Sequence, residues 1–268
     1  MSPALTYVYC IVRSAAPPSL RAVPRAMPGG EAVRLIEVAL TAGTTMRHWM
    51  AVSSVPERAY GEAALERGLQ RFDWVGQRAL VHEAVVEHFL DRPALLPMQL
   101  FTIFKSDGRA VEDVLRNRRR LSRLLARIER QAEWGVRAVW DPVAAGREAA
   151  PHTDDGQARR RVPQAEPGAR YLAQKRDARD RVLELEVRAR TDAHRLYRAM
   201  AAKATKSRRR TDLERSSPGS RLLLDAAFLV PKGRARAFQA AARRHAAALE
   251  RSNIAVSLTG PWPAYNFI

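Results

Sequence analysis

The spacing of apolar residues predicts several strands in the first half of the sequence. Runs rich in valine, isoleucine, leucine and tyrosine predict strands over residues 7–12, 34–40, 48–55 and 94–104. The last run is apolar on both alternating sets of positions, which is typical of a strand covered on both faces. Four prolines and a Gly29-Gly30 pair within residues 14–30 predict a long loop after the first strand.

Other segments have the three- and four-residue spacing of a helix face. Val75, Ala79, His82, Val86 and Phe89 predict a helix that ends before Pro93, because proline disfavours a helical residue in front of it. The same spacing predicts helices over residues 111–132, 169–202 and 235–249. Further strands are predicted over residues 134–140, 222–230 and 254–258.

This alternation of strands and helices indicates an α+β protein with two domains. We expect an N-terminal domain over residues 1–141 and a linker over residues 142–167, which are rich in proline, glycine, alanine and charge. A C-terminal α+β domain with a long helix should then occupy residues 168–268. The pattern alone does not select the sheet topology of either domain.

The composition is strongly basic, with 46 lysine and arginine residues against 28 acidic ones and a net charge of +18. Such a charge attracts nucleic acid, anionic surfaces or acidic proteins, although a GC-rich genome produces similar arginine enrichment through codon usage. No apolar run reaches the length of about 18 residues that a spanning helix needs. The lone Cys10 and the absence of a visible secretory signal predict a cytoplasmic protein.

Three arginine runs occupy residues 118–120, 159–161 and 208–210, and the last two lie in predicted loops. They are interpreted as solvated faces, as contacts for an acidic protein, or as phosphate contacts whose affinity falls steeply with salt. No nucleic-acid-binding motif accompanies them. The candidate electrostatic contacts are Arg159, Arg160, Arg161, Arg208, Arg209 and Arg210.

Motifs for catalysis, metal binding or cofactor binding are missing from the sequence. His82 and His88 are six residues apart rather than four, so on a helix they face different directions and would not share a zinc ion. We therefore expect His82 to be a structural histidine. Nucleophile-elbow, Walker and dinucleotide-binding motifs are also absent. The sequence thus predicts a protein that is not an enzyme and that binds no cofactor or metal.

The last residues of the sequence combine two prolines with three aromatic side chains. Because proline fixes φ and removes a donor, neither a helix nor an interior strand should continue through residues 260–263. Trp262, Tyr265 and Phe267 are too apolar to be left in water, so we expect a docked tail. These aromatic residues either hold the tail across a sheet or form a partly exposed patch that captures an apolar partner.

Several motifs occur in an order that resembles one protein family. They are Tyr7-Val8-Tyr9-Cys10-Ile11-Val12, Leu96-Pro97-Met98, Glu133-Trp134-Gly135-Val136, Gly168-x-x-Tyr171-Leu172-x-x-Lys175, Ala227-Phe228-Leu229-Val230 and Leu258-Thr259-Gly260-Pro261-Trp262-Pro263-x-Tyr265-x-Phe267. Together they resemble the gas vesicle GvpL/GvpF family of accessory proteins. One segment departs from the family pattern: where the pattern reads Arg-Phe-Gly-Thr, this chain has Gln99-Leu100-Phe101-Thr102.

The resemblance implies a ferredoxin-like α/β sandwich in the N-terminal domain and a non-enzymatic role in gas vesicle assembly. Members are thought to bind the small hydrophobic shell protein and other minor vesicle proteins during nucleation and shell growth. The implied location is the cytoplasm, at the gas vesicle, with no membrane partner. We expect partner contacts at Leu96, Met98, Leu100 and Phe101, and at Trp262, Tyr265 and Phe267. The alternative is a basic nucleic-acid-associated protein that uses its arginine-rich loops.

Overall fold

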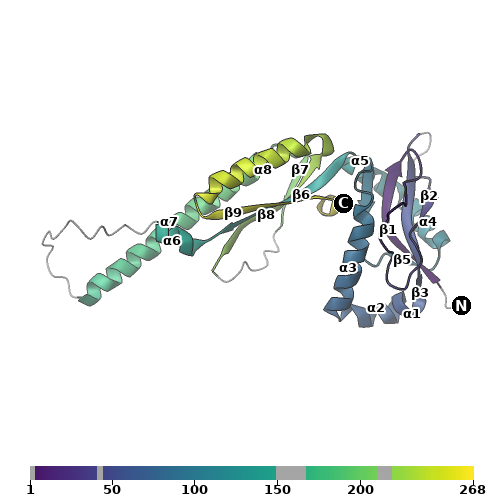
Figure 1. Cartoon of the computed structure of the whole chain (residues 1–268), viewed down its shortest axis with the longest axis horizontal. Helices are drawn as coiled ribbons and strands as arrows, with labels where there is room; N and C mark the ends of the chain where they lie inside the picture. The colour runs from purple at the N-terminus through teal and green to yellow at the C-terminus, as the bar shows by residue number, and fades with distance from the viewer. Residues whose placement is uncertain (1–3, 41–44, 149–166, 211–218) are drawn as a thin grey trace. The chain divides into compact units, whose positions relative to one another are not determined.

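The computed structural model describes residues 4–40, 45–148, 167–210 and 219–268, and Figure 1 shows their elements. The chain forms two compact units. Unit 1 consists of Met1–Glu133, Pro231–Gly233 and Gly260–Ile268, and unit 2 consists of Trp134–Val230 and Arg234–Thr259. The structure is a mixed α/β protein with two antiparallel sheets.

These units differ in their limits from the predicted domains. Unit 1 ends its first stretch at Glu133 rather than at residue 141, because the strand that follows pairs within the second sheet. It also includes the tail residues 260–268, which the sequence analysis placed in the second domain. The predicted linker begins with a helix, α6 (Pro142–Glu148), and the remainder of that linker lies outside the described residues.

The sheet of unit 1 has the order β2-β3-β1-β4, and its strands are β1 (Ala4–Ser14), β2 (Arg34–Val38), β3 (Arg47–Pro56) and β4 (Ala94–Pro97). The short strand β5 (Ile103–Phe104) also pairs with β1. Successive side chains of a strand point to opposite faces. Tyr7 contacts His82 of α3, whereas its neighbour Thr6 donates to Asp107 of α4. The sheet therefore lies between α3 and α4, which explains why β1 is buried on both faces.

The helices of unit 1 are α1 (Glu57–Tyr60), α2 (Glu62–Leu69), α3 (Phe72–Glu87), α4 (Asp107–Arg116) and α5 (Arg118–Ile128). The helix predicted over residues 111–132 is thus two helices, which is a correction. Its break falls at Asn117, whose side-chain amide donates to the carbonyl oxygen of Asp113 at 2.9 Å. A side chain that bonds the backbone locally in this way competes with helix continuation.

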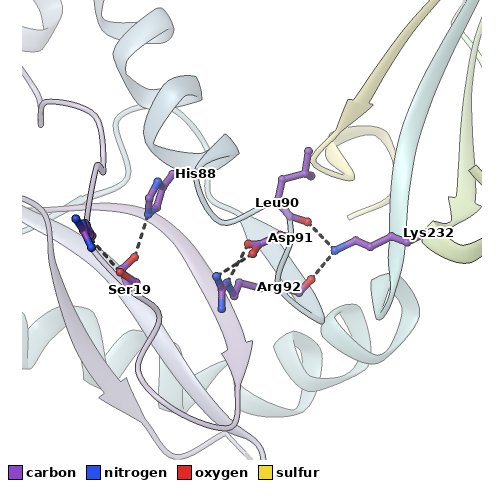
Figure 2. Close-up of polar contacts among 7 residues, drawn as sticks. Ser19, His88, Leu90, Asp91, Arg92 and Lys232 are labelled. Atoms are coloured by element: carbon purple, nitrogen blue, oxygen red, sulfur yellow. Dashed lines mark hydrogen bonds and ion pairs between the residues drawn. The ribbon is translucent and has the colours of Figure 1, made fainter.

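The short segment Pro231–Gly233, just before α8, belongs to unit 1, and its Lys232 bonds the backbone of that unit (Figure 2). Lys232 Nζ donates to the carbonyl oxygens of Leu90 and Arg92 at 2.6 and 2.5 Å, just beyond the C-terminal end of α3. A cation is favourable there because helix C-terminal carbonyls carry partial negative charge. Burial lowers the pKa of Lys232 below its ordinary value. Nearby, the ring of His88 bonds the carbonyl oxygen of Ser19 at 3.0 Å, which ties the loop after β1 to the same helix end.

The sheet of unit 2 has the order β7-β8-β6-β9, with β6 (Gln131–Trp140), β7 (Lys206–Arg209), β8 (Arg221–Pro231) and β9 (Ile254–Trp262). Alternate residues of β6 and β8 pack against the long helix α7 (Pro167–Ala201) and against α8 (Ala235–Glu250). The core includes Trp134, Val136, Phe228 and Phe238. Two single-turn 3₁₀ helices, η1 (Lys232–Arg234) and η2 (Tyr265–Phe267), complete the secondary structure described.

The two sheets have the same strand order relative to the chain, 2-3-1-4. Apart from the short helix α6 and the 3₁₀ helix η1, the described elements of unit 2 follow the order β-α-β-β-α-β, with α7 and α8 as the two crossover helices. In unit 1 the described residues 15–33 between β1 and β2 contain no helix. Among the described elements, this order therefore occurs in unit 2, and the ferredoxin-like N-terminal domain that the resemblance implies stays a prediction.

Candidate docking surface

The segment predicted as one strand over residues 94–104 is interrupted by a turn at residues 98–102, which is a correction. Thr102 N donates to Gln99 O at 3.1 Å and closes the turn, and Phe101 has a φ of 65°. This left-handed conformation costs a non-glycine residue about 1–2 kcal/mol. Phe101 stands where the family pattern has its glycine. Phe101 thus has a backbone conformation that glycine adopts more readily.

A chain of buried hydrogen bonds fixes this turn to β1 and α3. Phe101 N donates to Tyr7 Oη at 3.2 Å, and Tyr7 Oη lies 2.8 Å from His82 Nδ1. His82 Nε2 lies 3.2 Å from the carbonyl oxygen of Met98. Because that carbonyl can only accept, Nε2 carries the proton and Nδ1 accepts from Tyr7. Burial lowers the pKa of His82 to about 4, so the ring is neutral at physiological pH.

The ring of Phe101 lies against the first turns of α3. It stacks on Trp74 with ring centroids 5.4 Å apart and planes at 26°. The guanidinium of Arg78 lies over the Trp74 ring, 3.8 Å from its centroid, and Arg78 is itself buried. This stacking offsets part of the cost of the left-handed backbone at Phe101.

The tail, residues 260–268, is held in unit 1 by a buried carboxylate. Glu133 is 2% exposed and accepts hydrogen bonds from Asn266 N at 2.8 Å and from Asn266 Nδ2 at 2.5 Å. Arg127 adds a bond to the carbonyl oxygen of Phe267 at 3.3 Å. The polar clamp at Glu133 therefore helps to fix the position of the tail.

The aromatic residues of the tail differ in how deeply they are buried. Phe267 is 8% exposed, whereas Trp262 and Tyr265 are half-buried. Tyr265 Oη is enclosed and has no hydrogen-bond partner among the described residues. Burial, followed by the nearby carboxylate of Glu83, raises the pKa of Tyr265 above its ordinary value. Tyr265 therefore stays protonated while it lines the hollow described next.

The turn and the tail form two walls of an open hollow against α3, which we call the docking groove. Its volume is about 390 Å³, and it is lined by Ala79, His82, Glu83, Met98, Gln99, Leu100, Tyr265 and Ile268. A second hollow of about 290 Å³ shares Met98, Gln99 and Ile268 with it and extends over α4 and α5. Ile268, between the two hollows, is 40% exposed. The lining is mainly apolar, as is typical of binding sites.

The outer face of α3 extends this apolar surface. Residues three, four and seven apart share one helix face, which places Phe72 and Gly76 in line with Ala79 and Glu83 of the docking groove. Phe72 is 90% exposed and Leu80 is 74% exposed. Large apolar side chains exposed together next to a hollow are characteristic of an interaction surface.

The charged groups of the docking groove are few. Burial, together with the neighbouring Glu87, raises the pKa of Glu83 above its ordinary value, and the buried His82 is neutral. The surface thus offers apolar contact and little charge, in contrast to the strongly basic chain as a whole.

The structure brings together three of the seven candidate contacts of the sequence analysis. Met98, Leu100 and Tyr265 line the docking groove, although more than 160 residues separate the turn from the tail. Leu96 is buried in β4 and reaches the second hollow only. Phe101 stacks on Trp74, and neither Trp262 nor Phe267 is among the lining residues. Phe72, Leu80 and Ile268 were missed. Leu80 lies off the predicted apolar stripe of α3, and this could have identified it, whereas Phe72 continues the three- and seven-residue spacing of that stripe.

The arginine candidates lie elsewhere. Arg159, Arg160 and Arg161 are outside the described residues. Residues 206–209 form the edge strand β7 rather than the predicted loop, because they pair with Ala226 to Leu229 of β8. Arg209 lies 4.3 Å from the ring centroid of Tyr197 and bonds His194, and Arg210 pairs with Asp225 at 3.6 Å. Arg209 and Arg210 therefore have partners within unit 2, and the use of this arginine run as an electrostatic contact stays a prediction.

The described residues contain no cluster of three or more histidine, cysteine or acidic residues that could hold a metal ion. His82 is occupied by Tyr7 and Met98, and His88 bonds Ser19. The described helices also include none that is long and apolar enough to cross a membrane.

Comparisons with known proteins agree over nearly the whole chain. The family described as Gas vesicle synthesis protein GvpL/GvpF matches residues 5–268. Gas vesicle protein L of Streptomyces sp. (strain CB03234) is 28% identical over 274 residues, covering 98% of this chain and 92% of that protein. The fold is similar to the crystal structure of GvpF from Anabaena sp. PCC7120, with a TM-score of 0.64, 13% identity and coverage of 98% and 95% of the two chains. It is also similar to GvpF from Microcystis aeruginosa, with a TM-score of 0.59, 15% identity and 99% coverage of both chains.

Proposed function

Because this chain belongs to the GvpL/GvpF family and acts in gas vesicle formation, we propose that it is a non-enzymatic accessory protein that binds the small hydrophobic shell subunit. Binding would cover apolar surface of that subunit until it is added to a growing shell, and other minor vesicle proteins are further candidate partners. We also propose that the protein works in the cytoplasm, at the gas vesicle.

The observation that carries this proposal is the apolar surface on α3. Phe72 and Leu80 are exposed at 90% and 74%, and they adjoin a groove that contains little charge. Exposing such side chains in water is unfavourable, and burying one of them fully in a complex contributes about 1.5–3 kcal/mol. A partner with an apolar helix or strand face would gain this contribution at both residues. The lining contains no lysine or arginine, which favours an apolar partner over nucleic acid, because nucleic acid binds mainly through its phosphates.

Co-expression with the shell subunit, followed by pulldown at low salt and at about 0.5 M salt, tests this proposal, because exposed charge pairs are screened at the higher concentration. We expect capture that resists salt. Leu80→Gln, alone or with Phe72→Gln, should lower capture by about tenfold or more without changing the melting temperature, since both side chains are exposed.

The matched control is Leu183→Gln, which makes the same change at another exposed leucine, on α7 of unit 2, where the side chain is 50% exposed. It should leave capture unchanged. Equal losses in Leu80→Gln and Leu183→Gln would show general stickiness and contradict the assigned surface. A wild-type protein that captures no shell subunit at either salt concentration would refute the proposed function.

For the fold, we propose that both units follow one ferredoxin-like plan, with the tail as an addition to unit 1. The shared 2-3-1-4 strand order supports this proposal, as do the two crossover helices of unit 2. Unit 1 would then be a variant in which a loop replaces the first crossover helix.

A further inference from the structure

The four sheet edges of the described structure differ in how they are protected. An unprotected edge strand pairs readily with another strand, and proteins block edges with charge, proline or short length. β2 is five residues long, and its two charged residues, Arg34 and Glu37, form ion pairs. β4 is four residues long and ends in Pro97, and β7 has four residues, three of them basic. β9 is nine residues long and carries no charge, and its one proline, Pro261, lies near its C-terminal end, so residues 254–259 contain none of these protecting features.

The backbone of β9 presents unused hydrogen-bonding groups to its outer side. Asp141 N donates to Asn253 O at 3.0 Å, and a side chain added at Gly135 would meet Thr259, so the antiparallel register with β6 is continuous between these points. Hydrogen-bonded positions alternate along an antiparallel strand. Ser257 therefore bonds toward β6, while the N–H and C=O groups of Val256 and Leu258 point away from it. β6 is the only neighbour of β9 in the described sheet.

A hollow of about 480 Å³ lies at the start of β9. Its walls come from β9, from the last turns of α8 and from the start of α6, and it is lined by Asp141, Ala144, Ala246, Ala247, Glu250, Asn253, Ile254, Ala255 and Val256. Most of the lining is alanine or another apolar residue. Both charged residues that line it are acidic, in a chain whose net charge is +18.

We propose that the outer edge of β9 binds an extended strand of the shell subunit by strand addition, an inference that rests on the proposed function. In this mode the main chain supplies the affinity, and pockets for alternate side chains supply the specificity. The bound strand is uncharged where it pairs with Val256 and Leu258. It places an apolar side chain in the hollow and carries a basic residue next to Asp141 and Glu250.

Filling the hollow tests this inference. Ala247 lines the hollow and is exposed, whereas its neighbour Ala248 is also exposed on α8 but does not line the hollow. We expect Ala247→Trp to lower capture of the co-expressed shell subunit by about tenfold or more, as filling a binding pocket does. Ala248→Trp, the matched control, should capture like the wild type.

Amide hydrogen exchange of the wild-type chain gives a second readout that needs no variant. In the free protein the amide of Ser257 should be protected, and those of Val256 and Leu258 should exchange rapidly. Binding of the shell subunit should protect the latter two. Wild-type capture that Ala247→Trp leaves unchanged, with no added protection, would overturn the inference and leave the proposed function standing.

Two further outcomes also decide the matter. Protection of Val256 and Leu258 that rises with protein concentration in the absence of the shell subunit would assign the edge to a second copy of this chain and overturn the inference. A wild-type chain that captures no shell subunit would overturn both the inference and the proposed function.

Discussion

Phe101 offers a test in which glycine should be better tolerated than alanine. Its φ of 65° is costly for any side chain, by about 1–2 kcal/mol, whereas glycine adopts it freely. Phe101→Ala loses the stacking on Trp74 and keeps the backbone cost, so it should destabilise the protein by about 2–3 kcal/mol. Phe101→Gly loses the same ring but removes the backbone cost. The greater freedom of glycine in the unfolded chain opposes this gain by about 0.5–1 kcal/mol.

The free energy of unfolding should therefore be highest for the wild type, lower for Phe101→Gly and lowest for Phe101→Ala, and the two variants should differ by about 0.5–1 kcal/mol. Urea unfolding followed by tryptophan fluorescence measures this difference. Leu100 is the control, because its φ is not positive and its alanine variant should be more stable than its glycine variant. The same order at both positions, with alanine better at each, would refute the argument that Phe101 occupies a glycine conformation.

Three other residues give predictions of defined sign. Glu133→Ala should lower the free energy of unfolding by about 2–4 kcal/mol, release the tail and expose its aromatic residues to chymotrypsin. Glu133→Gln should have a smaller effect, because its side chain can still bond Asn266. Unchanged digestion of Glu133→Ala would contradict the role of Glu133 in holding the tail. His82 has a pKa of about 4 in the folded state and an ordinary value of 6.5, so the unfolded state binds more protons between these pH values. The free energy of unfolding should therefore fall by about 3 kcal/mol as the pH falls from 6.5 to 4. His82→Gln should flatten this part of the pH profile in urea unfolding, and an unaltered profile would rule out His82 as its source. Lys232→Met should lower the free energy of unfolding by about 2–3 kcal/mol through the loss of two bonds to carbonyl oxygens, and an unchanged urea midpoint would show that these bonds are dispensable.

Much of the secondary structure could be predicted because it depends on local periodicity. The run of buried residues from Tyr7 to Val12 and the stripe of α3 are visible in the sequence alone, since each follows the period of one element. The turn at residues 98–102 was not predicted, because bonds from Tyr7 and Tyr9, about 90 residues away, stabilise it in an otherwise strand-like run. Local propensity carries no signal for such long-range bonds.

The candidate site shows the same limit. Met98, Leu100 and Tyr265 were identified as apolar residues in distinctive motifs, but no pattern placed the turn and the tail on one groove. That placement depends on Glu133, which in the sequence is an ordinary acidic residue just before a predicted strand. Burying a carboxyl group is unfavourable unless it is hydrogen-bonded, and the two Asn266 donors that bond Glu133 lie 133 residues away.

The residues that hold the docking groove in place differ from the residues that would contact a partner. His82 fixes the turn and Glu133 fixes the tail, and both are buried polar residues with satisfied hydrogen bonds. Phe72, Leu80 and Ile268, by contrast, contribute little to folding because large parts of their side chains remain exposed. Stability and capture should therefore respond to different substitutions. A loss of capture in Glu133→Ala comes with a released tail, whereas a loss in Leu80→Gln leaves the fold intact, and comparing the two variants distinguishes a displaced wall of the groove from a missing contact.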